Sequence, residues 1–262
     1  MTISQNTTTS QIILPDTSLC AIVRDEIMNP AGGIVDFVDS TLPYVESGVI
    51  VDTGSKDGTR EALEELKLKY SHLEVYDLEF QGFAHARNES LKHCKTKRAL
   101  VLDADERLTR ADFEYVREKI LSPENVLVGI YNFGFLNVYQ DKTSDSREGL
   151  NPRLFNVDGL NFEELVWEVA KYTAIGRQYN IHRLETKIKH FCPSQELLKM
   201  KDHFYKQFDD LKENMIDSCF LDILSTIPAF KNWWLKRNIK PLRDFSVFQD
   251  LRKYNPKREE YR

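Results

Sequence analysis

Short apolar runs alternate with amphipathic segments through the first hundred residues, and this alternation constrains the fold more than any other feature. Each run has five or six residues, the length and composition of a strand buried on both faces. Such alternation builds parallel strand–helix–strand units, so we expect an α/β protein with a Rossmann-like, mostly parallel central sheet and helices on both faces. The expected strands are 18–23, 48–52, 73–78 and 98–102. The expected helices are 34–44, 84–93 and, between these two, a segment that ends near Tyr70 and has Asp57 or Thr59 as its cap.

The alternation weakens beyond Val126, where strand-like pieces follow one another without clear helices between them. They cover 126–133, 153–155 and 187–191. From Gln195 the pattern becomes helical, because apolar residues recur at spacings of seven, four, three and four. We therefore expect a polar N-terminal tail over 1–16, one α/β domain over 17–192, and a helical C-terminal appendage over 193–262.

Charge is unevenly distributed along the 262 residues. The chain has 36 basic and 41 acidic side chains, net −5, which argues against nucleic acid as a partner. Residues 231–262 nevertheless carry ten basic and four acidic side chains, net +6. This basic and aromatic region has two interpretations. It either docks on an anionic membrane surface or packs its aromatic residues internally and exposes its charges to solvent.

Nothing in the sequence predicts export or a membrane span. The first residues are polar, without a basic stretch followed by an apolar run, and no apolar stretch reaches the length of a spanning helix. The four cysteines (Cys20, Cys94, Cys192 and Cys219) are scattered and form no Cys-x-x-Cys pair. This scattered placement of the cysteines favours reduced thiols over a disulfide framework or a zinc site. We therefore expect a cytoplasmic protein with, at most, a peripheral membrane contact.

Acidic residues follow three of the expected strands at the point where each strand ends. Asp25 and Glu26 follow the first, Asp52 the second, and Asp103 and Asp105 the fourth. Ligands of open α/β sheets collect at this edge, and so much negative charge there indicates a bound cation or hydrogen-bond donors. In an extended or turning backbone the two aspartates of Asp-Ala-Asp point the same way, so they predict a Mg²⁺ or Mn²⁺ site that stays open to substrate phosphates.

The Asp-x-Asp pair after a strand is also typical of haloacid-dehalogenase-type phosphatases. Those enzymes have Thr or Val two residues further on, where this chain has Arg107. The phosphatase interpretation is therefore disfavoured.

Four motifs occur in order along the first half of the chain. They are Ser18-Leu-Cys-Ala-Ile-Val-Arg-Asp-Glu26, Val51-Asp-Thr-Gly-Ser-Lys-Asp-Gly-Thr59, Gly82-Phe-Ala-His-Ala-Arg-Asn-Glu-Ser90 and Val101-Leu-Asp-Ala-Asp-Glu106. Together they resemble the family 2 glycosyltransferases, in particular a bacterial branch, strongly over residues 18–110 and more weakly to about 191. The resemblance implies the GT-A fold, a nucleotide-sugar donor, usually a UDP-sugar, and transfer with inversion. One departure is Thr53, where many members have Asp.

The resemblance also implies roles for the donor-side residues. Val23 and Glu26 would line the nucleotide pocket, and Asp52 would hydrogen-bond the base. Arg87 and Asn88 would lie near the nucleotide and its phosphates. Asp105 would bind the metal, and Asp103, assigned to the same metal site, would contact the ribose or a metal-bound water.

The second half of the chain would carry the acceptor side. Arg153, in Asn151-Pro-Arg-Leu-Phe155, resembles an Arg-x-Phe element that precedes the acceptor site in the bacterial branch. An aromatic loop ending in His-Glu follows there, and Trp167 replaces the His in this chain. Glu168 is then the candidate general base, with Glu163 and Glu164 as alternatives.

A histidine late in the domain often completes the metal site of the family. His190 matches it, and His182 is a rival.

The chemistry explains these residue types. A nucleoside diphosphate leaves with growing negative charge, which a divalent metal and Arg87 would stabilise, while a carboxylate on the opposite face takes the acceptor's proton. Two alternatives remain: a nucleotidyltransferase that makes sugar nucleotides, and a non-catalytic binding protein on a decayed transferase domain. The first would need a Gly-rich basic loop after the first strand, where this chain has Arg24-Asp-Glu-Ile-Met-Asn29. The transferred sugar and the acceptor, whether a glycan, a lipid-linked molecule or a protein, are not specified by the sequence.

Overall fold

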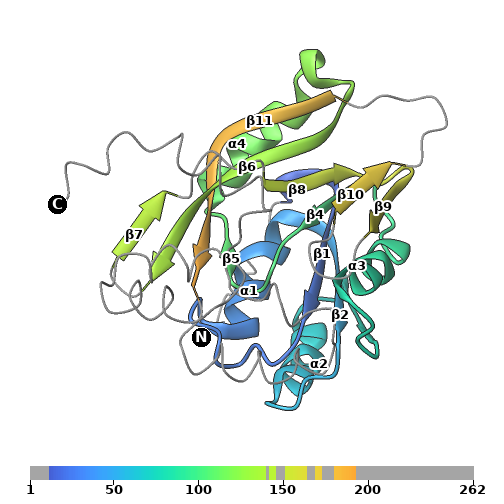
Figure 1. Cartoon of the computed structure of the whole chain (residues 1–262), viewed down its shortest axis with the longest axis vertical. Coiled ribbons are helices and arrows are strands. Elements are labelled where there is room, and N and C mark those ends of the chain that lie inside the picture. Colours follow the sequence, from blue (N-terminus) through green and yellow to red (C-terminus); the bar gives the residue numbers. More distant parts are fainter. Residues whose placement is uncertain (1–11, 140–141, 146–150, 164–168, 173–179, 193–262) are drawn as a thin grey trace, which may run out of the picture. The chain divides into compact units, whose positions relative to one another are not determined.

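A computed structural model describes residues 12–139, 142–145, 151–163, 169–172 and 180–192. In this part of the chain the central sheet has the strand order β3-β2-β1-β4-β8-β6-β11-β5, and β7 pairs with β6 (Figure 1). A separate two-stranded sheet pairs β9 with β10. The strands are β1 Leu14–Val23, β2 Val45–Asp52, β3 Leu73–Asp77, β4 Arg98–Val101, β5 Glu106–Arg107, β6 Val128–Tyr139, β7 Lys142–Asp145, β8 Asn151–Asn156, β9 Leu160–Glu163, β10 Val169–Tyr172 and β11 Asn180–Phe191.

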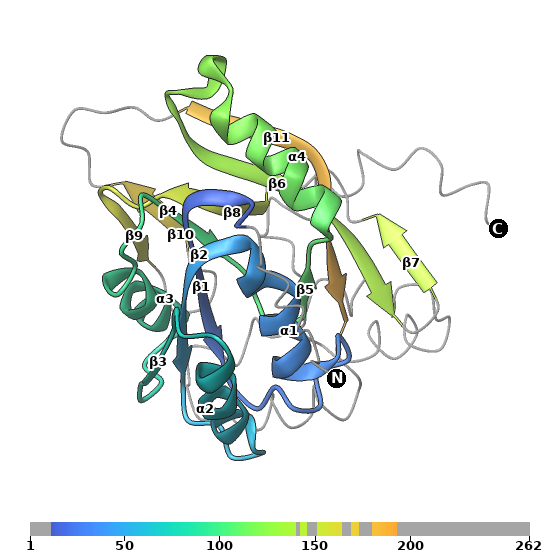
Figure 2. The same ribbon diagram turned by 180° about the vertical axis from the view of Figure 1, so that it is seen from behind.

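Helices cover both faces of the parallel half of the sheet, as the sequence predicts (Figures 1 and 2). Successive residues of β1 point to opposite faces, so Leu19 and Ala21 pack with α1, α2 and α4, whereas Cys20 packs with α3. Both faces are therefore buried, which is why residues 19–23 of β1 and 48–51 of β2 are apolar. The helices are α1 Gly33–Thr41, α2 Thr59–Lys69, α3 Phe83–Lys92 and α4 Arg110–Leu121, with short 3-10 turns at Leu42–Tyr44 and Pro123–Asn125.

The sheet is parallel over β3, β2, β1 and β4 and mixed beyond them. β8 runs antiparallel to both β4 and β6, while β11 returns parallel to β6. The α/β prediction is thus confirmed, and the sheet is more mixed than expected. The physical reason is that strand direction beyond β4 is set by pairing between strands distant in sequence: β8 lies between β4 and β6 and runs antiparallel to both.

Helix α4 is not among the helices expected from the sequence. A capping box begins it: the Thr109 side chain accepts from the Asp112 backbone N–H at 3.3 Å, and the Thr109 N–H donates to Asp112 Oδ2 at 2.7 Å. Phe113, Val116 and Ile120 then bury one face of the helix. The Thr-x-x-Asp pattern before that apolar spacing is the signal that could have predicted it.

Some expectations concern residues outside the described ranges: residues 1–11 of the expected N-terminal tail 1–16, the candidate bases Glu164 and Glu168, and the helical appendage 193–262. Residues 14–16 of that tail are instead the start of β1. Within the described ranges, no helix is long and apolar enough to cross a membrane. Cys20 and Cys94 are free thiols, as expected, but Cys192 is disulfide-bonded, so the expectation of reduced thiols is wrong at that position.

Candidate donor-binding site

The loops after β1 and β2 are joined by hydrogen bonds at four successive residues. Arg24 donates to the Thr53 carbonyl, and the Asp25 N–H donates to Ser55 Oγ at 2.9 Å. The next two N–H groups, of Glu26 and Ile27, donate to Thr59 Oγ1 at 2.7 Å and to Asp57 Oδ2 at 2.9 Å. The hydroxyl and carboxylate side chains of the Thr-Gly-Ser-Lys-Asp-Gly-Thr turn therefore hold the first loop in place.

Asp52 ends β2 inside this pair of loops and is 1% exposed. Its Oδ1 accepts from the backbone N–H groups of Gly54 and Ser55, both at 2.7 Å. Its Oδ2 is buried and has no hydrogen-bond partner among the described residues. A buried carboxylate oxygen with an open acceptor site is costly, and a ligand N–H or O–H donor is what would satisfy it.

Two arginines from distant parts of the sequence converge on Asp103, which follows β4. Arg87, on α3 and 2% exposed, donates to Asp103 Oδ1, and Arg153, on β8, donates to Asp103 Oδ2 at 3.1 Å. Arg153 also donates twice through Nε and once through Nη2 to the carboxylate of Glu106, at 2.6 to 3.1 Å. Glu106 is 1% exposed. Two cations and two anions thus form one balanced cluster at the edge of the sheet.

In this cluster the pKa values of the two carboxylic acids are shifted in opposite directions. Burial by itself would raise the pKa of Asp103, but Arg87 and Arg153 outweigh it and hold that pKa well below its ordinary range. Burial raises the pKa of Glu106 above its ordinary value, although Arg153 acts against this. Asp103 therefore keeps its charge to lower pH than an ordinary aspartate does, and it pairs with both arginines.

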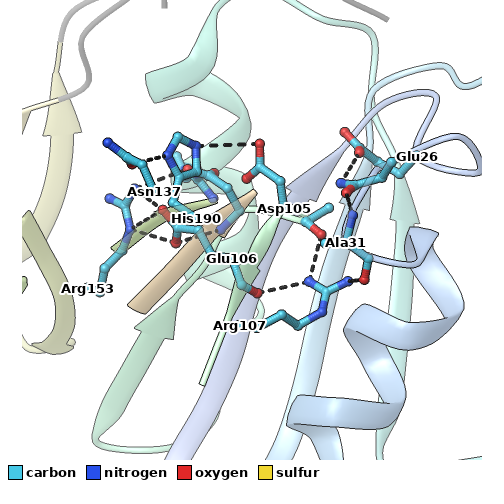
Figure 3. Close-up of polar contacts among 12 residues, drawn as sticks. Glu26, Ala31, Asp105, Glu106, Arg107, Asn137, Arg153 and His190 are labelled. Atoms are coloured by element: carbon cyan, nitrogen blue, oxygen red, sulfur yellow. Dashed lines mark hydrogen bonds and ion pairs between the residues drawn. The ribbon is translucent and has the colours of Figure 1, made fainter. Parts of the chain in front are cut away.

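Asp105 and His190 face each other next to this cluster (Figure 3). His190 Nε2 lies 3.7 Å from Asp105 Oδ2, and its Nδ1 lies 3.1 Å from Asn137 Oδ1. Because an amide oxygen only accepts, Nδ1 is the donor in that contact, and Nε2 is directed at Asp105. The Phe191 N–H also donates to the Asp105 carbonyl at 2.9 Å, so β11 holds both residues together.

The structure does not bring all of the expected metal ligands to one point. Within the described residues no three His, Cys, Asp or Glu side chains are grouped around a position for a metal ion. Asp103 faces the arginines, whereas Asp105 and His190 form a pair. The rival His182 lies beside the Tyr131 ring, with ring centroids 5.9 Å apart.

Three other expected site residues have well-defined positions. Val23 is buried in the core, and its carbonyl accepts from the Thr53 N–H at 3.0 Å. The Glu26 carboxylate accepts from Asn29 Nδ2 at 2.7 Å. Asn88 uses both ends of its amide on the backbone of Phe162, at 2.8 and 2.9 Å, and so anchors β9 to α3. Glu163 follows directly and is exposed.

Sequence reasoning did not select Glu106, Arg107 or Asn137 as site residues. Glu106 and Arg107 extend the Asp-Ala-Asp motif, and both are buried although charged. Buried charge leaves no mark in a linear sequence, because it depends on partners such as Arg153 that come from other strands. Asn137 carries no local signal at all.

These observations define the class of protein: an α/β fold of the GT-A type with acidic loops and an arginine pair at the carboxyl edge of its parallel strands. The family model described as glycosyl transferase family 2 matches residues 38–204. The chain therefore belongs to glycosyl transferase family 2.

Known proteins resemble the chain over part or most of its length. A TPR repeat-containing protein of Synechococcus elongatus is 32% identical over 111 residues, which make up 42% of this chain and 26% of that protein. The chain thus spans about a quarter of the length of this curated relative.

Two solved structures share the fold at low sequence identity. TarS 1-349 of S. aureus, in complex with UDP-GlcNAc, has a TM-score of 0.51 at 14% identity, covering 85% of this chain and 76% of that one. Another structure of S. aureus TarS has a TM-score of 0.50 at 13% identity, covering 85% and 46%. At these identities the likeness shows the fold alone.

Proposed function

We propose that this chain transfers a sugar from a nucleotide-sugar donor, a UDP-sugar, to a hydroxyl group with inversion at the anomeric carbon. The observation that carries the proposal is the convergence of Arg87 and Arg153 beside Asp105 and His190. This site offers guanidinium groups and metal-ligand atoms together, which is the combination that a departing nucleoside diphosphate requires. Family membership and the donor named for the TarS complex support the same donor class.

The nucleoside would bind between the loops after β1 and β2. The buried Asp52 Oδ2 can accept a hydrogen bond from an N–H of the base, and Glu26 lies on the neighbouring loop. The bonds between these loops keep both acceptors in place before the nucleotide arrives, which lowers the entropy cost of binding.

The diphosphate would lie toward Asp105 and the arginine pair. Arg87 and Arg153 are already held by Asp103 and Glu106, so no side chain must be reoriented as negative charge develops on the leaving group. In this proposal Asp103 acts mainly by positioning the two arginines.

A divalent cation, Mn²⁺ or Mg²⁺, fits the donor set beside them. Asp105 offers a carboxylate oxygen and His190 a ring nitrogen whose orientation is set by Asn137. Such ions are often held by few protein ligands, with substrate phosphates completing the coordination. When bound, the ion would neutralise charge on the diphosphate.

The proton of the acceptor hydroxyl would go to a carboxylate on the opposite face of the sugar. Glu168 is the proposed base, with Glu163 and Glu164 as alternatives, and Asn88 anchors the strand that leads to this segment. A single base and no protein nucleophile give inversion.

Donor hydrolysis tests the proposal without a known acceptor. The full chain is incubated with UDP-, GDP- and dTDP-sugars, with EDTA or with Mn²⁺, and the nucleoside diphosphate released is quantified. We expect release from a UDP-sugar that depends on metal, and NMR of the freed sugar before mutarotation should show the inverted anomer. Release of pyrophosphate from a sugar phosphate and UTP would instead indicate a nucleotidyltransferase. No binding or turnover of any donor would contradict the proposal.

A further inference from the structure

The guanidinium of Arg107 lies between two loops of the proposed donor site (Figure 3). On one side its Nη1 donates to the carbonyls of Ala104 and Glu106, at 2.8 and 2.9 Å. These two carbonyls flank Asp105 in the chain. One nitrogen of Arg107 therefore clamps the backbone on both sides of the proposed metal ligand.

On the other side, Nη2 donates to the carbonyls of Ala31 and Gly33, at 2.9 and 3.3 Å. The turn that presents these carbonyls depends on two glycines with positive φ, 95° at Gly32 and 75° at Gly33. A side chain at Gly33 would also place its Cβ 2.9 Å from the Ile27 carbonyl oxygen. Glycine is needed here for the carbonyls to converge on the guanidinium.

The same turn holds Glu26. Asn29 accepts from the N–H groups of Gly32 and Gly33 through its carbonyl, and its side-chain amide donates to Glu26 Oε2 at 2.7 Å. The Glu26 carbonyl in turn accepts from the Ile34 N–H at 3.0 Å. Arg107 thus connects the backbone around Asp105 to the turn that holds Glu26.

All five N–H groups of Arg107 are used, because Nε donates to Asp36 Oδ2 at 2.9 Å. The residue is 7% exposed, and its guanidinium lies 5.3 Å from the centroid of the Phe37 ring. Lysine has a single nitrogen with three donors and cannot span four carbonyls and a carboxylate.

We propose that Arg107 is a positioning residue that sets the separation between the nucleoside side of the donor site, at Glu26, and the diphosphate side, at Asp105. The proposal rests on the proposed function. Arg107 contacts neither the substrate nor the metal in this proposal. It acts through the two loops that it joins. A nucleoside diphosphate spans both sides of the site and depends on that separation, whereas a nucleoside alone does not.

The test compares UDP with uridine on the full chain in the presence of Mn²⁺. For Arg107→Lys we expect UDP affinity, by isothermal titration, to fall about tenfold, because small misplacements at such sites have effects of that order or larger. Uridine affinity, by ligand-observed NMR, should change less than about twofold. Arg110→Lys is the matched control, since Arg110 is exposed on α4 and pairs only with Glu114 among the described residues; it should bind both ligands normally.

Circular dichroism and thermal unfolding accompany each variant. A folded Arg107→Lys protein that binds UDP as the wild type does, or loses UDP and uridine affinity equally, overturns the inference. If Arg107→Lys does not fold, the affinities of Asp36→Ala for UDP and uridine are measured instead. Asp36 is largely exposed, and its replacement by Ala removes the acceptor of one Arg107 donor. We expect this variant to lose about two- to threefold in UDP affinity with uridine affinity retained, and unchanged UDP affinity overturns the inference. A wild-type protein that binds no nucleoside diphosphate would instead contradict the proposed function itself.

Discussion

At the scale of residues, the donor site depends on pairing charges that could not be buried singly. Arg87 and Arg153 are cationic, Asp103 and Glu106 balance them, and Asp105 lies just outside the balanced set with His190. Removing one member of a buried group of charges leaves another uncompensated. Substitutions here should therefore affect both stability and chemistry, and conservative replacements separate the two.

Asp105→Asn keeps the size of the side chain and removes its charge. We expect metal-dependent donor hydrolysis to fall by about two decades or more, because an amide is a poor ligand for a hard cation beside a diphosphate. Glu118→Gln, at an exposed site on α4, is the matched control and should hydrolyse donor at the wild-type rate. Near-normal turnover of Asp105→Asn that still requires metal would show that Asp105 is not the ligand.

Glu168→Gln tests the assignment of the base. We expect turnover to fall by about two decades while UDP affinity stays unchanged, since a general base acts on the attacking hydroxyl and not on the nucleotide. Glu163→Gln and Glu164→Gln are measured alongside. If one of them loses turnover and Glu168→Gln does not, the base is that residue.

The Arg87–Asp103 pair should make stability depend on pH. An aspartate whose folded pKa is depressed contributes stability above its unfolded pKa of about 4 and loses it as the pH falls through the folded value. We expect the free energy of unfolding in urea to decrease from about pH 5 to pH 2, and to decrease less steeply in Arg87→Met. In that variant the pKa of Asp103 lies closer to its unfolded value.

Arg110→Met serves as the control for this measurement, because Arg110 and Glu114 are both exposed. It should keep the wild-type dependence on pH. Parallel curves for the wild type and Arg87→Met would mean that the arginine does not depress the pKa of Asp103.

At the scale of elements, each loop of the site is held by the end of a regular element. β1, β2 and β4 end at the same edge of the sheet, so their following loops meet, and α3 brings Arg87 and Asn88 across to them. β11 then aligns His190 with Glu106 through antiparallel pairing with β5. The site is thus built from elements that extend from β1 to β11 along the chain.

Helix α4 packs beneath this arrangement, against β1 and β11, and its capping box offers a test at this scale. Thr109→Ala should reduce the free energy of unfolding by about 1 kcal/mol, because an N-terminal N–H of the helix loses its acceptor. Urea unfolding measures the change. Thr143→Ala, on the exposed strand β7, should be close to neutral, and an equal loss in both variants would contradict a specific capping effect.

At the scale of the whole molecule, charge is segregated along the chain: net +6 over residues 231–262 and net −11 over the rest. We expect the full chain to sediment with vesicles that contain anionic lipid and much less with neutral ones. The double variant Lys236→Glu/Arg237→Glu should bind at least about tenfold more weakly, since each basic residue near such a surface contributes about 1 kcal/mol.

Lys92→Glu/Lys95→Glu makes the same change in net charge at exposed positions of the α/β domain and is the control. It should retain binding. Sedimentation that is insensitive to anionic lipid would leave the basic region as a solvated surface.

The sequence by itself determined the α/β class, the strands that end in acidic residues and the family, because these depend on local periodicity and contiguous motifs. It did not determine the sheet beyond β4, where direction is set by long-range pairing, nor helix α4, whose capping signal is short. Only the tertiary structure decided that Asp103 faces two arginines and that Asp105 faces His190, since Arg153 and His190 come from later strands. The buried role of Arg107 follows for the same reason: its acceptors come from segments more than seventy residues apart, and only folding brings them around one guanidinium.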